Sequence, residues 1–466
     1  MSRAPRPRPE QATPIKEAAA RAADEPMSRE LTFEHVLTPA GIESQRALRL
    51  DSEGRISAIE PCDPRGPFDG WLALPGMPNA HSESWGRGLV GYSEGVQAPG
   101  GAGIDAQRAA LQRLADGLDA DTLYDLCWQA YREMLACGFT SVVEFHRLHH
   151  RADGARAGEL IETVIRAATD AGVRQAFIPV FGSAAGFGAA AGDANPRFLH
   201  RDVEDFLTTV AMYRKHCAGV AAASPGSLPA EMLADMALGA GELLGADTPV
   251  HVPVAATAAE VEACLASTGR RPVHYLAETV ELGAHWSLVH ATHADASERE
   301  CILASKATVV VCPLQAARAG EGGFPAAEFA AAGGRLALGS GDGLRGDPVD
   351  ALRWLEYGQR VYSGQSKCFG DADGAGAGTW RRLAAGGATA LGLHVGAIEI
   401  GAHADLVTLD MSNPIFATVD GPAAALDALL TSGDGRCIEQ RWVGGQRSVP
   451  ADGGDYASAV RRIMSR

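Results

Sequence analysis

The sequence lacks several features that would place it in a class at once. No apolar run reaches the roughly 18 residues that a membrane-spanning helix requires, so we expect no transmembrane segment. Basic side chains are outnumbered: 41 Lys and Arg stand against 57 Asp and Glu, and the formal net charge of −16 disfavours binding to nucleic acid or to an acidic membrane. The first residues contain arginines and prolines but no apolar core of the kind that a secretory signal has.

The nine cysteines also lack a familiar pattern. None forms a Cys-x-x-Cys pair, and several stand within apolar runs, as reduced and buried structural thiols do. Together with the missing apolar core of a signal sequence, this usage predicts a cytoplasmic protein.

What the chain does have is enough apolar material for a large core. With 466 residues and a hydrophobic fraction of 46%, it is long enough for about two to three ordinary domains, or for one large barrel with an accessory domain. Residues 1–28 are rich in Pro, Arg and Ala without periodicity, which predicts a disordered tail.

Short extended stretches occur towards both ends of the chain. Near the start, "LTFEHVLT", "RALRLD" and "RISAIE" are separated by turns that contain glycine, and "ADLVTLDM" and "CIEQRWVGGQRSV" follow near the other end. Neither group is large enough for a core of its own. We therefore predict one composite β-sandwich domain of residues 29–73 and 396–449, followed by a C-terminal tail at 450–466.

Between these stretches, short apolar strands alternate with amphipathic helical segments. In one helix, Leu123, Leu126 and Met134 recur at helical spacing and Gly138 follows the last turn. Eight apolar strands with crossover helices predict an α/β fold, a closed (β/α)8 TIM-like barrel over residues 74–395, because strands covered on both faces are apolar throughout. A doubly wound open sheet is the alternative, although no Gly-x-Gly-x-x-Gly follows the first strand. The predicted strands are "WLALPG", "TSVVEF", "QAFIPVF", "GVAAAS", "PVHVPVAA", "WSLVHAT", "TVVVCP" and "RLALGS".

Polar side chains follow four of these strands, at the end where such a barrel carries its chemistry. Each also has an ordinary structural explanation: Glu144 and His146 can belong to a hydrogen-bonded loop, and Asp342 among glycines can form a turn. Among the residues named in the next sentence, we expect His81, Glu83 and His290 to face a shared cavity. The set comprises His81 and Glu83 after the first strand, Glu144 and His146 after the second, His290 and His293 after the sixth, and Asp342 after the eighth.

Several longer stretches are distinctive: "LPGMPNAHS", "GFTSVVEFH", "GRRPV", "LVHATH", "FPAAEFAAAGGRLALGS" and "ALRWLEYGQRV", spread from about Leu74 to Val361. In these the chain resembles the amidohydrolase superfamily, and within it the formimidoylglutamate deiminases of histidine degradation. The strand "ADLVTLD" near the other end supports the match. The resemblance implies a barrel plus a composite β-sandwich domain, and a metal centre at the barrel mouth.

The resemblance carries over to the family's metal ligands at only some positions. Where the family has His-x-His after the first strand, this chain has His81 and Glu83. On the fifth strand, Pro253 takes the place of the ligand histidine and Ala256 that of the acid three residues later, with His251 at a flanking position.

The later strands differ in the same way. The family's sixth-strand histidine is present here as His290. At the end of the eighth strand the family has Gly-Ser-Asp, whereas this chain has "GSGDG", which puts Gly341 at the ligand position and Asp342 one residue later. A catalytic zinc needs about three protein ligands and an open position. Only His81, Glu83 and His290 remain to supply them.

The substrate-holding positions change as well. Gly226 and Pro229 replace a histidine and an arginine after the fourth strand, and Ala316 replaces an acid after the seventh. These replacements argue against turnover of formimidoylglutamate itself. The substrate-binding candidates that remain are Arg87, Glu144 and His146.

We therefore expect a formimidoylglutamate-deiminase-like protein with a degenerate metal centre, which does not carry out the zinc-dependent deimination and instead binds a small molecule or acts as a pseudoenzyme. The alternative is a divergent hydrolase that acts on a C–N bond other than a peptide bond, with Glu83, His290 and Asp342 as its catalytic residues. No cofactor is expected, and zinc is present only if His81, Glu83 and His290 hold it. We expect a small-molecule ligand and no nucleic-acid or membrane partner. The sequence leaves a homodimer open.

Overall fold

The computed structural model describes residues 29–92, 104–189, 194–448 and 455–464. Eight of its strands form one parallel sheet: β5 (Met77–Ser82), β6 (Phe139–His146), β7 (Arg174–Phe181), β8 (Val220–Ala222), β9 (Val250–Val254), β10 (Trp286–His290), β11 (Thr308–Val311) and β12 (Arg335–Leu338). Each strand pairs with the next one along the chain. Sequential parallel pairing of this kind is the arrangement of a (β/α)8 barrel.

The barrel closes where its last strand meets its first. Just beyond β12, the Gly341 N–H donates to the His81 carbonyl over 3.0 Å, and the Glu83 N–H donates to the Gly341 carbonyl over 2.9 Å. The predicted barrel is confirmed. The closing seam includes two of the residues that the sequence singled out.

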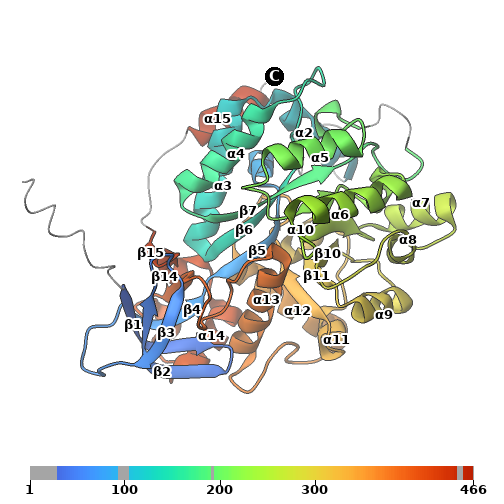
Figure 1. Ribbon diagram of the computed structural model, residues 1–466. Coiled ribbons are helices and arrows are strands. Elements are labelled where there is room, and N and C mark those ends of the chain that lie inside the picture. The colour runs from blue at the N-terminus through green and yellow to red at the C-terminus, as the bar shows by residue number, and fades with distance from the viewer. Residues whose placement is uncertain (1–28, 93–103, 190–193, 449–454, 465–466) are drawn as a thin grey trace, which may run out of the picture.

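Helices surround the barrel (Figure 1). The predicted helix over "TLYDLCWQAYREMLACG" is confirmed as α3, which ends at Gly138 with φ +111°, a conformation that suits glycine. The helices are η1 (Ser84–Leu89), α2 (Ile104–Gly117), α3 (Ala120–Cys137), α4 (Gly158–Ala171), η3 (Pro196–Phe198), α5 (Val203–Met212), η4 (Pro225–Ser227), α6 (Ala230–Leu244), α7 (Ala258–Thr268), α8 (Pro272–Thr279), α9 (Ala296–Ser305), α10 (Pro313–Ala319), α11 (Ala326–Ala331), α12 (Pro348–Ser363), α13 (Ala375–Leu391), η5 (Pro414–Phe416), α14 (Pro422–Ser432), η6 (Gly435–Cys437) and α15 (Tyr456–Met464).

A second, mixed sheet joins the two ends of the chain. It contains β1 (Glu30–Thr38), β2 (Gly41–Leu50), β3 (Ile56–Pro61), β4 (Gly70–Pro75), β13 (Leu406–Leu409), β14 (Ile438–Val443) and β15 (Gln446–Arg447), in the order β15-β14-β13-β4-β1-β2-β3. Figure 1 shows its early strands in blue beside its late strands in red. The rings of Phe33 and Trp442, from opposite ends of the chain, pack edge to face with centroids 5.7 Å apart. The composite second domain is therefore confirmed.

One strand assignment was wrong. "WLALPG" was predicted to be the first barrel strand, but it forms β4, which pairs with β1 and β13 in the second sheet. The first barrel strand is β5, directly after Gly76. The mistake has a physical cause, because Leu72 to Pro75 are buried just as a barrel strand is. The residue limits given for the two domains stay a prediction.

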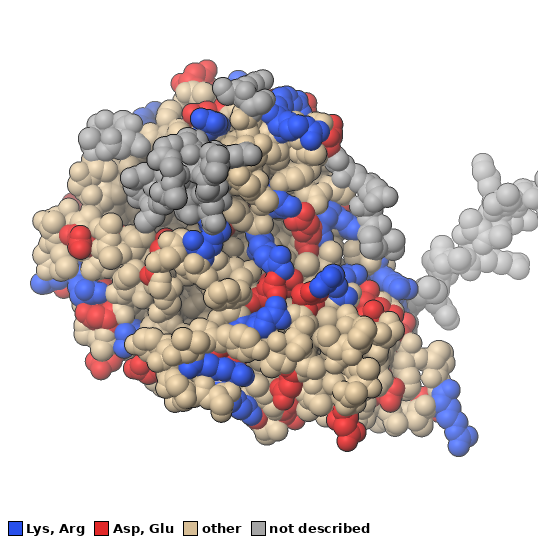
Figure 2. Space-filling view, turned by 180° about the vertical axis from the view of Figure 1, so that it is seen from behind, with Lys and Arg blue, Asp and Glu red and all other residues tan. Residues whose placement is uncertain are grey.

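The barrel has a closed end and an open end. Near the start of β9, His251 donates from Nε2 to the Ala390 carbonyl of α13 over 2.8 Å, and Ala390 and Leu391 belong to the core of the barrel interior. Within the predicted C-terminal tail, α15 packs against α2 and α3, and the predicted disordered tail at 1–28 lies outside the described residues. None of the helices described is long and apolar enough to cross a membrane. Acidic and basic side chains are interspersed over the described part of the face in Figure 2.

Candidate active site

Two histidines meet at the open end of the barrel. The ring of His81 lies 4.7 Å from that of Phe145 and 5.9 Å from that of His290, between centroids. His290 (φ +70°) and Ala291 (φ +50°) both adopt the left-handed conformation, which turns the chain sharply at the end of β10. The structure thus brings together the first-strand and sixth-strand histidines that the sequence predicted to share a cavity.

Both imidazoles are neutral at ordinary pH. Burial lowers the pKa of His290 to about 4. Burial, and secondarily the neighbouring His290 and His251, holds the pKa of His81 well below its usual value. The Nδ1 atom of His81 is buried without a hydrogen-bond partner among the described residues. The pair can therefore offer lone pairs or act on a neutral ligand, but it does not provide a positive charge.

Glu83 is held by an arginine that the sequence analysis missed. Its carboxylate lies 3.6 Å from the Arg147 guanidinium, Oε1 to Nη1. Burial raises the pKa of Glu83, and the positive charge of Arg147 opposes that rise. Arg147 also stacks on the Phe198 ring, 4.7 Å from its centroid. The signal was present in "EFHRLHH", where a basic side chain follows the second strand, but its partner could not be known.

Asp342 is engaged in a similar way. Its carboxylate forms an ion pair with Arg318 of α10 and accepts the backbone N–H of Leu344 over 3.4 Å. The bond with Leu344 forms a turn, which is the ordinary structural explanation that the sequence offered for an aspartate among glycines. Arg318 was not predicted, since it lies on α10, the helix that follows another strand.

The predicted substrate-binding residues lie apart from the two histidines. Glu144 is on the outer face of β6, because its neighbours Val143 and Phe145 fill the barrel interior and successive strand residues alternate. It accepts the Tyr131 hydroxyl over 2.8 Å and the Ser84 N–H over 3.4 Å. Burial raises the pKa of Glu144 to about 8, although these hydrogen bonds lower it.

Arg87 is an anchor between helices. Its Nε and Nη2 donate to the two oxygens of Glu133 over 2.7 and 3.0 Å, and its Nη1 donates to the Tyr456 hydroxyl over 2.6 Å. These bonds tie η1 to α3 and α15. A part for Arg87, Glu144 and His146 in substrate binding stays a prediction.

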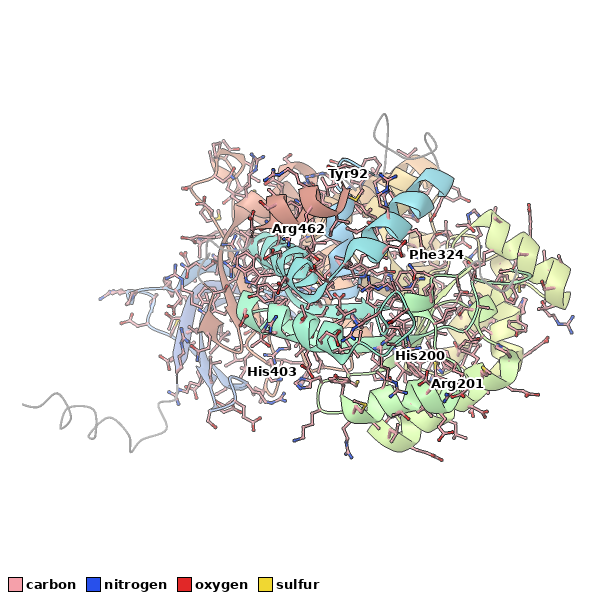
Figure 3. The ribbon with its side chains drawn as sticks, turned by 90° about the horizontal axis from the view of Figure 1, so that it is seen from above. Tyr92, His200, Arg201, Phe324, His403 and Arg462 are labelled. Carbon is pink, nitrogen blue, oxygen red and sulfur yellow. The ribbon has the colours of Figure 1, made fainter. Side chains whose placement is uncertain are left out.

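His146 belongs instead to a cluster of buried histidines beside β6 and β7. Its Nε2 donates to the Leu148 carbonyl over 2.9 Å. Centroid distances are 5.2 Å from His146 to His149, 4.4 Å from His149 to His200 and 5.2 Å from His150 to His200. Figure 3 labels His200, just before α5. Neither ring nitrogen of His200 has a hydrogen-bond partner among the described residues, and burial lowers its pKa to about 3.

Two positions at which the resemblance implies a side chain are instead packed around glycine. A Cβ on Gly341 (φ +71°) would lie 2.0 Å from Oε1 of Gln315, and a Cβ on Gly226 would lie 2.5 Å from Cδ2 of Phe187. Pro253 lies opposite Val289 in the β9–β10 pairing and has no side-chain donor atom. The space that ligand side chains would occupy is thus taken by neighbouring groups.

These contacts determine whether side chains at the barrel mouth are placed to hold a metal ion. Within residues 29–92, 104–189, 194–448 and 455–464, no group of three or more His, Cys, Asp or Glu side chains is arranged to hold a metal ion. His81 and His290 face each other, while Glu83 and Asp342 are each paired with an arginine.

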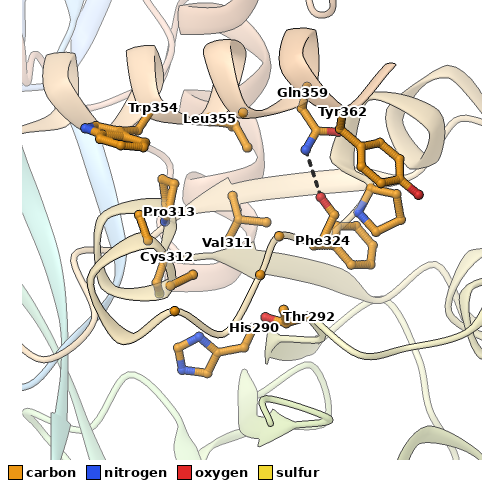
Figure 4. Close-up of a pocket in the computed structure, with 17 residues that line it drawn as sticks. His290, Thr292, Val311, Cys312, Pro313, Phe324, Trp354, Leu355, Gln359 and Tyr362 are labelled. Carbon is orange, nitrogen blue, oxygen red and sulfur yellow. Dashed lines mark hydrogen bonds between the residues drawn. The ribbon is translucent and has the colours of Figure 1, made fainter. Parts of the chain in front are cut away.

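A cavity of about 520 Å³ opens beside His290. It lies between the ends of β10 and β11 on one side and helix α12 on the other (Figure 4). Its lining is mainly apolar and aromatic: His290, Thr292, Val311, Cys312, Pro313, Ala316, Ala317, Gly320, Gly322, Gly323, Phe324, Pro325, Trp354, Leu355, Gly358, Gln359 and Tyr362. The volume is in the range of small-molecule sites.

Comparison with known proteins agrees with the architecture. The profile of the Amidohydrolase family matches residues 73–447. The chain is 34% identical over 427 residues to formimidoylglutamate deiminase of Pseudomonas aeruginosa, covering 88% of this chain and 93% of the relative. It is 29% identical over 374 residues to a 5-methylthioadenosine/S-adenosylhomocysteine deaminase of Halobacterium salinarum, covering 79% of each.

Solved structures show the same fold. The crystal structure of an amidohydrolase from Brucella melitensis superimposes with a TM-score of 0.82 at 30% identity, covering 94% of this chain and 98% of that one. An adenosine deaminase from Xanthomonas campestris with bound zinc superimposes with a TM-score of 0.75 at 21% identity, covering 94% and 97%. From its profile match, its relatives and its architecture, this chain belongs to the amidohydrolase family.

Proposed function

We propose that this protein is a formimidoylglutamate-deiminase-like amidohydrolase with a degenerate metal centre. In this proposal it does not carry out zinc-dependent deimination, and it binds a small molecule at the barrel mouth. The 34% identity to a formimidoylglutamate deiminase supports the descent. The geometry of the mouth supports the loss of the reaction.

The observation that carries the proposal is the packing at Gly341. An aspartate there would need φ near +71°, which side chains with a Cβ rarely adopt, and its Cβ would overlap Oε1 of Gln315 at 2.0 Å. The same overlap occurs at Gly226, where the Phe187 ring occupies the space that a side chain would need. At both positions a neighbouring side chain lies where an added Cβ would stand, which supports the proposal.

The remaining donors do not fit a catalytic zinc. Such an ion takes about three protein ligands plus a water whose pKa it lowers. His81 and His290 supply two nitrogens, whereas the third candidate, Glu83, is paired with Arg147. The acid after the eighth strand, Asp342, forms an ion pair with Arg318, and a positive neighbour makes a carboxylate a weaker general base.

Metal analysis of the purified protein tests the proposal. We expect well under one equivalent of transition metal, and no ammonia release from formimidoylglutamate. A His81→Ala variant is the control: its residual metal content should equal that of the parent protein. One equivalent of zinc that disappears in His81→Ala would overturn the proposal.

A divergent hydrolase acting on a C–N bond is the second candidate. It is favoured by the neutral His290 and by Glu83, whose raised pKa suits a proton donor. Any turnover should then vanish in Glu83→Gln and persist in Glu231→Gln, a change of an exposed residue on α6. Unchanged turnover in Glu83→Gln would rule out this scheme.

A further inference from the structure

The cavity beside His290 has a lining without formal charge. None of the described residues that line it is Asp, Glu, Lys or Arg. Its one imidazole is that of His290, which is buried. The Cys312 thiol is protonated, since burial raises its pKa. A charged ligand would therefore lose its hydration here without gaining an opposite charge.

Part of the polar lining is already committed to the fold. Nε2 of Gln359 donates to the Phe324 carbonyl over 2.9 Å, and its Oε1 accepts the Ala327 N–H over 3.0 Å. These two bonds fasten Phe324 and the first turn of α11 to helix α12, which fixes one wall of the cavity. Figure 4 shows the bond to Phe324. On the opposite wall, the His290 imidazole and the Thr292 hydroxyl offer polar groups to a ligand.

Helix α12 brings aromatic side chains to the cavity. Trp354 is 54% exposed and Tyr362 is 80% exposed, and both belong to its lining. Phe324 is buried at the same site. Exposed rings at the rim of an apolar cavity offer flat faces against which a planar molecule can stack. Gly358, between Trp354 and Tyr362 on the helix, leaves the wall open, since a Cβ there would meet nothing within 4 Å.

We propose that this cavity binds an uncharged, planar aromatic molecule, with its rings against α12 and a neutral polar edge towards His290 and Thr292. This inference deepens the proposed function by naming a ligand class, and it rests on it. The proposed ligand class differs from the charged substrates of some relatives. The resemblance implies an acid at position 316, and Ala316 leaves the lining without that charge.

Three probes of equal shape and different charge test the ligand class. 2-Naphthamide is neutral, 2-naphthoate is an anion and 2-naphthamidine is a cation. Titration of the full-length protein, followed by calorimetry, should give about tenfold or more tighter binding of the amide than of either ion, because no lining group compensates a charge. Equal or tighter binding of either ion, or absence of amide binding, would overturn the proposal.

A variant that fills the cavity tests the site. Gly358→Phe should weaken binding of 2-naphthamide about tenfold or more, since its ring would occupy the ligand volume. Gly241→Phe is a matched control on α6, where a Cβ also meets nothing within 4 Å, and it should bind as the parent does. Both changes replace a helical glycine, so both should fold.

Two outcomes of the variant test are decisive. Equal amide binding in Gly358→Phe and in the parent would remove the site from this cavity, and so would equal weakening in both variants. Neither outcome changes the metal content, so failure of this inference and failure of the proposed function can be told apart.

Discussion

The two ends of the barrel are built differently. At the closed end, Asp405 accepts Nε and Nη2 of Arg174 over 2.7 and 2.9 Å and the Gly444 N–H over 2.7 Å, and His251 donates from Nε2 to the Ala390 carbonyl over 2.8 Å. These bonds link the second sheet and α13 to the barrel strands. The side chain of Asp405 is fully buried.

At the mouth, backbone strain gathers instead. Five described residues other than glycine have positive φ, and three of them, Ala255, His290 and Ala291, follow or end β9 and β10. Nδ1 of His81 and Oε1 of Gln315 are buried without partners among the described residues. Strain of this kind is kept where structure around it enforces it, commonly at ligand sites. The closed end thus carries side-chain bonds that hold the fold together, while the mouth carries strained backbone of the kind found at ligand sites.

The buried ion pair of the closed end should give the largest effect. Asp405→Asn leaves Arg174 without its counter-charge, and we expect the free energy of unfolding to fall by about 3 kcal/mol or more. The matched change at the mouth, Asp342→Asn, removes the partner of Arg318 in a more exposed pair and should cost about 1 kcal/mol or less. Urea denaturation measures both. Equal losses would contradict the contrast between the two ends.

Restoring an acid at the mouth should be the next largest effect. Gly341→Asp combines a positive φ with overlap on Gln315, and should lower the free energy of unfolding by about 3 kcal/mol. Gly364→Asp has the same φ of +71° with nothing within 4 Å, so it should cost only about 1 kcal/mol in the same urea assay. If the Gly341→Asp variant were as stable as the parent and bound zinc, the mouth would still accommodate the family's ligand.

The sequence predicted the barrel, the composite domain and the meeting of His81 with His290, because apolar alternation and strand ends are local signals. It could not show that β4 leaves the barrel, since a strand buried in either sheet has the same composition. It also missed Arg147 and Arg318, whose roles depend on carboxylates far away in the chain. Partners of this kind are set by the packing of separate loops.

The Glu144 carboxyl should give a smaller, pH-dependent effect. Burial raises its pKa from 4.5 to about 8, so the folded state favours the protonated acid. Its contribution is therefore complete below pH 4.5 and is lost as the pH rises towards 8. Between pH 5 and 7 the parent should lose about 2 kcal/mol relative to Glu144→Gln, measured by urea denaturation at each pH.

Tyr131→Phe sharpens that test. The Tyr131 hydroxyl donates to Glu144 and lowers its pKa, so removing it should extend the fall in stability to higher pH than in the parent. Parallel stability curves for the parent and Glu144→Gln would mean that this carboxyl does not titrate over the range.

The smallest effect is expected from His81, and it tests the mouth most directly. His81→Ala removes a ring whose Nδ1 makes no hydrogen bond, beside a seam held by backbone, and should cost about 1 kcal/mol. His251→Ala is the matched change at the closed end. It leaves the buried Ala390 carbonyl without its donor and should cost about 2 kcal/mol in urea denaturation. If His81→Ala destabilised the protein as much as His251→Ala, the imidazole at the mouth would be part of the framework, and its retention would no longer point to a ligand.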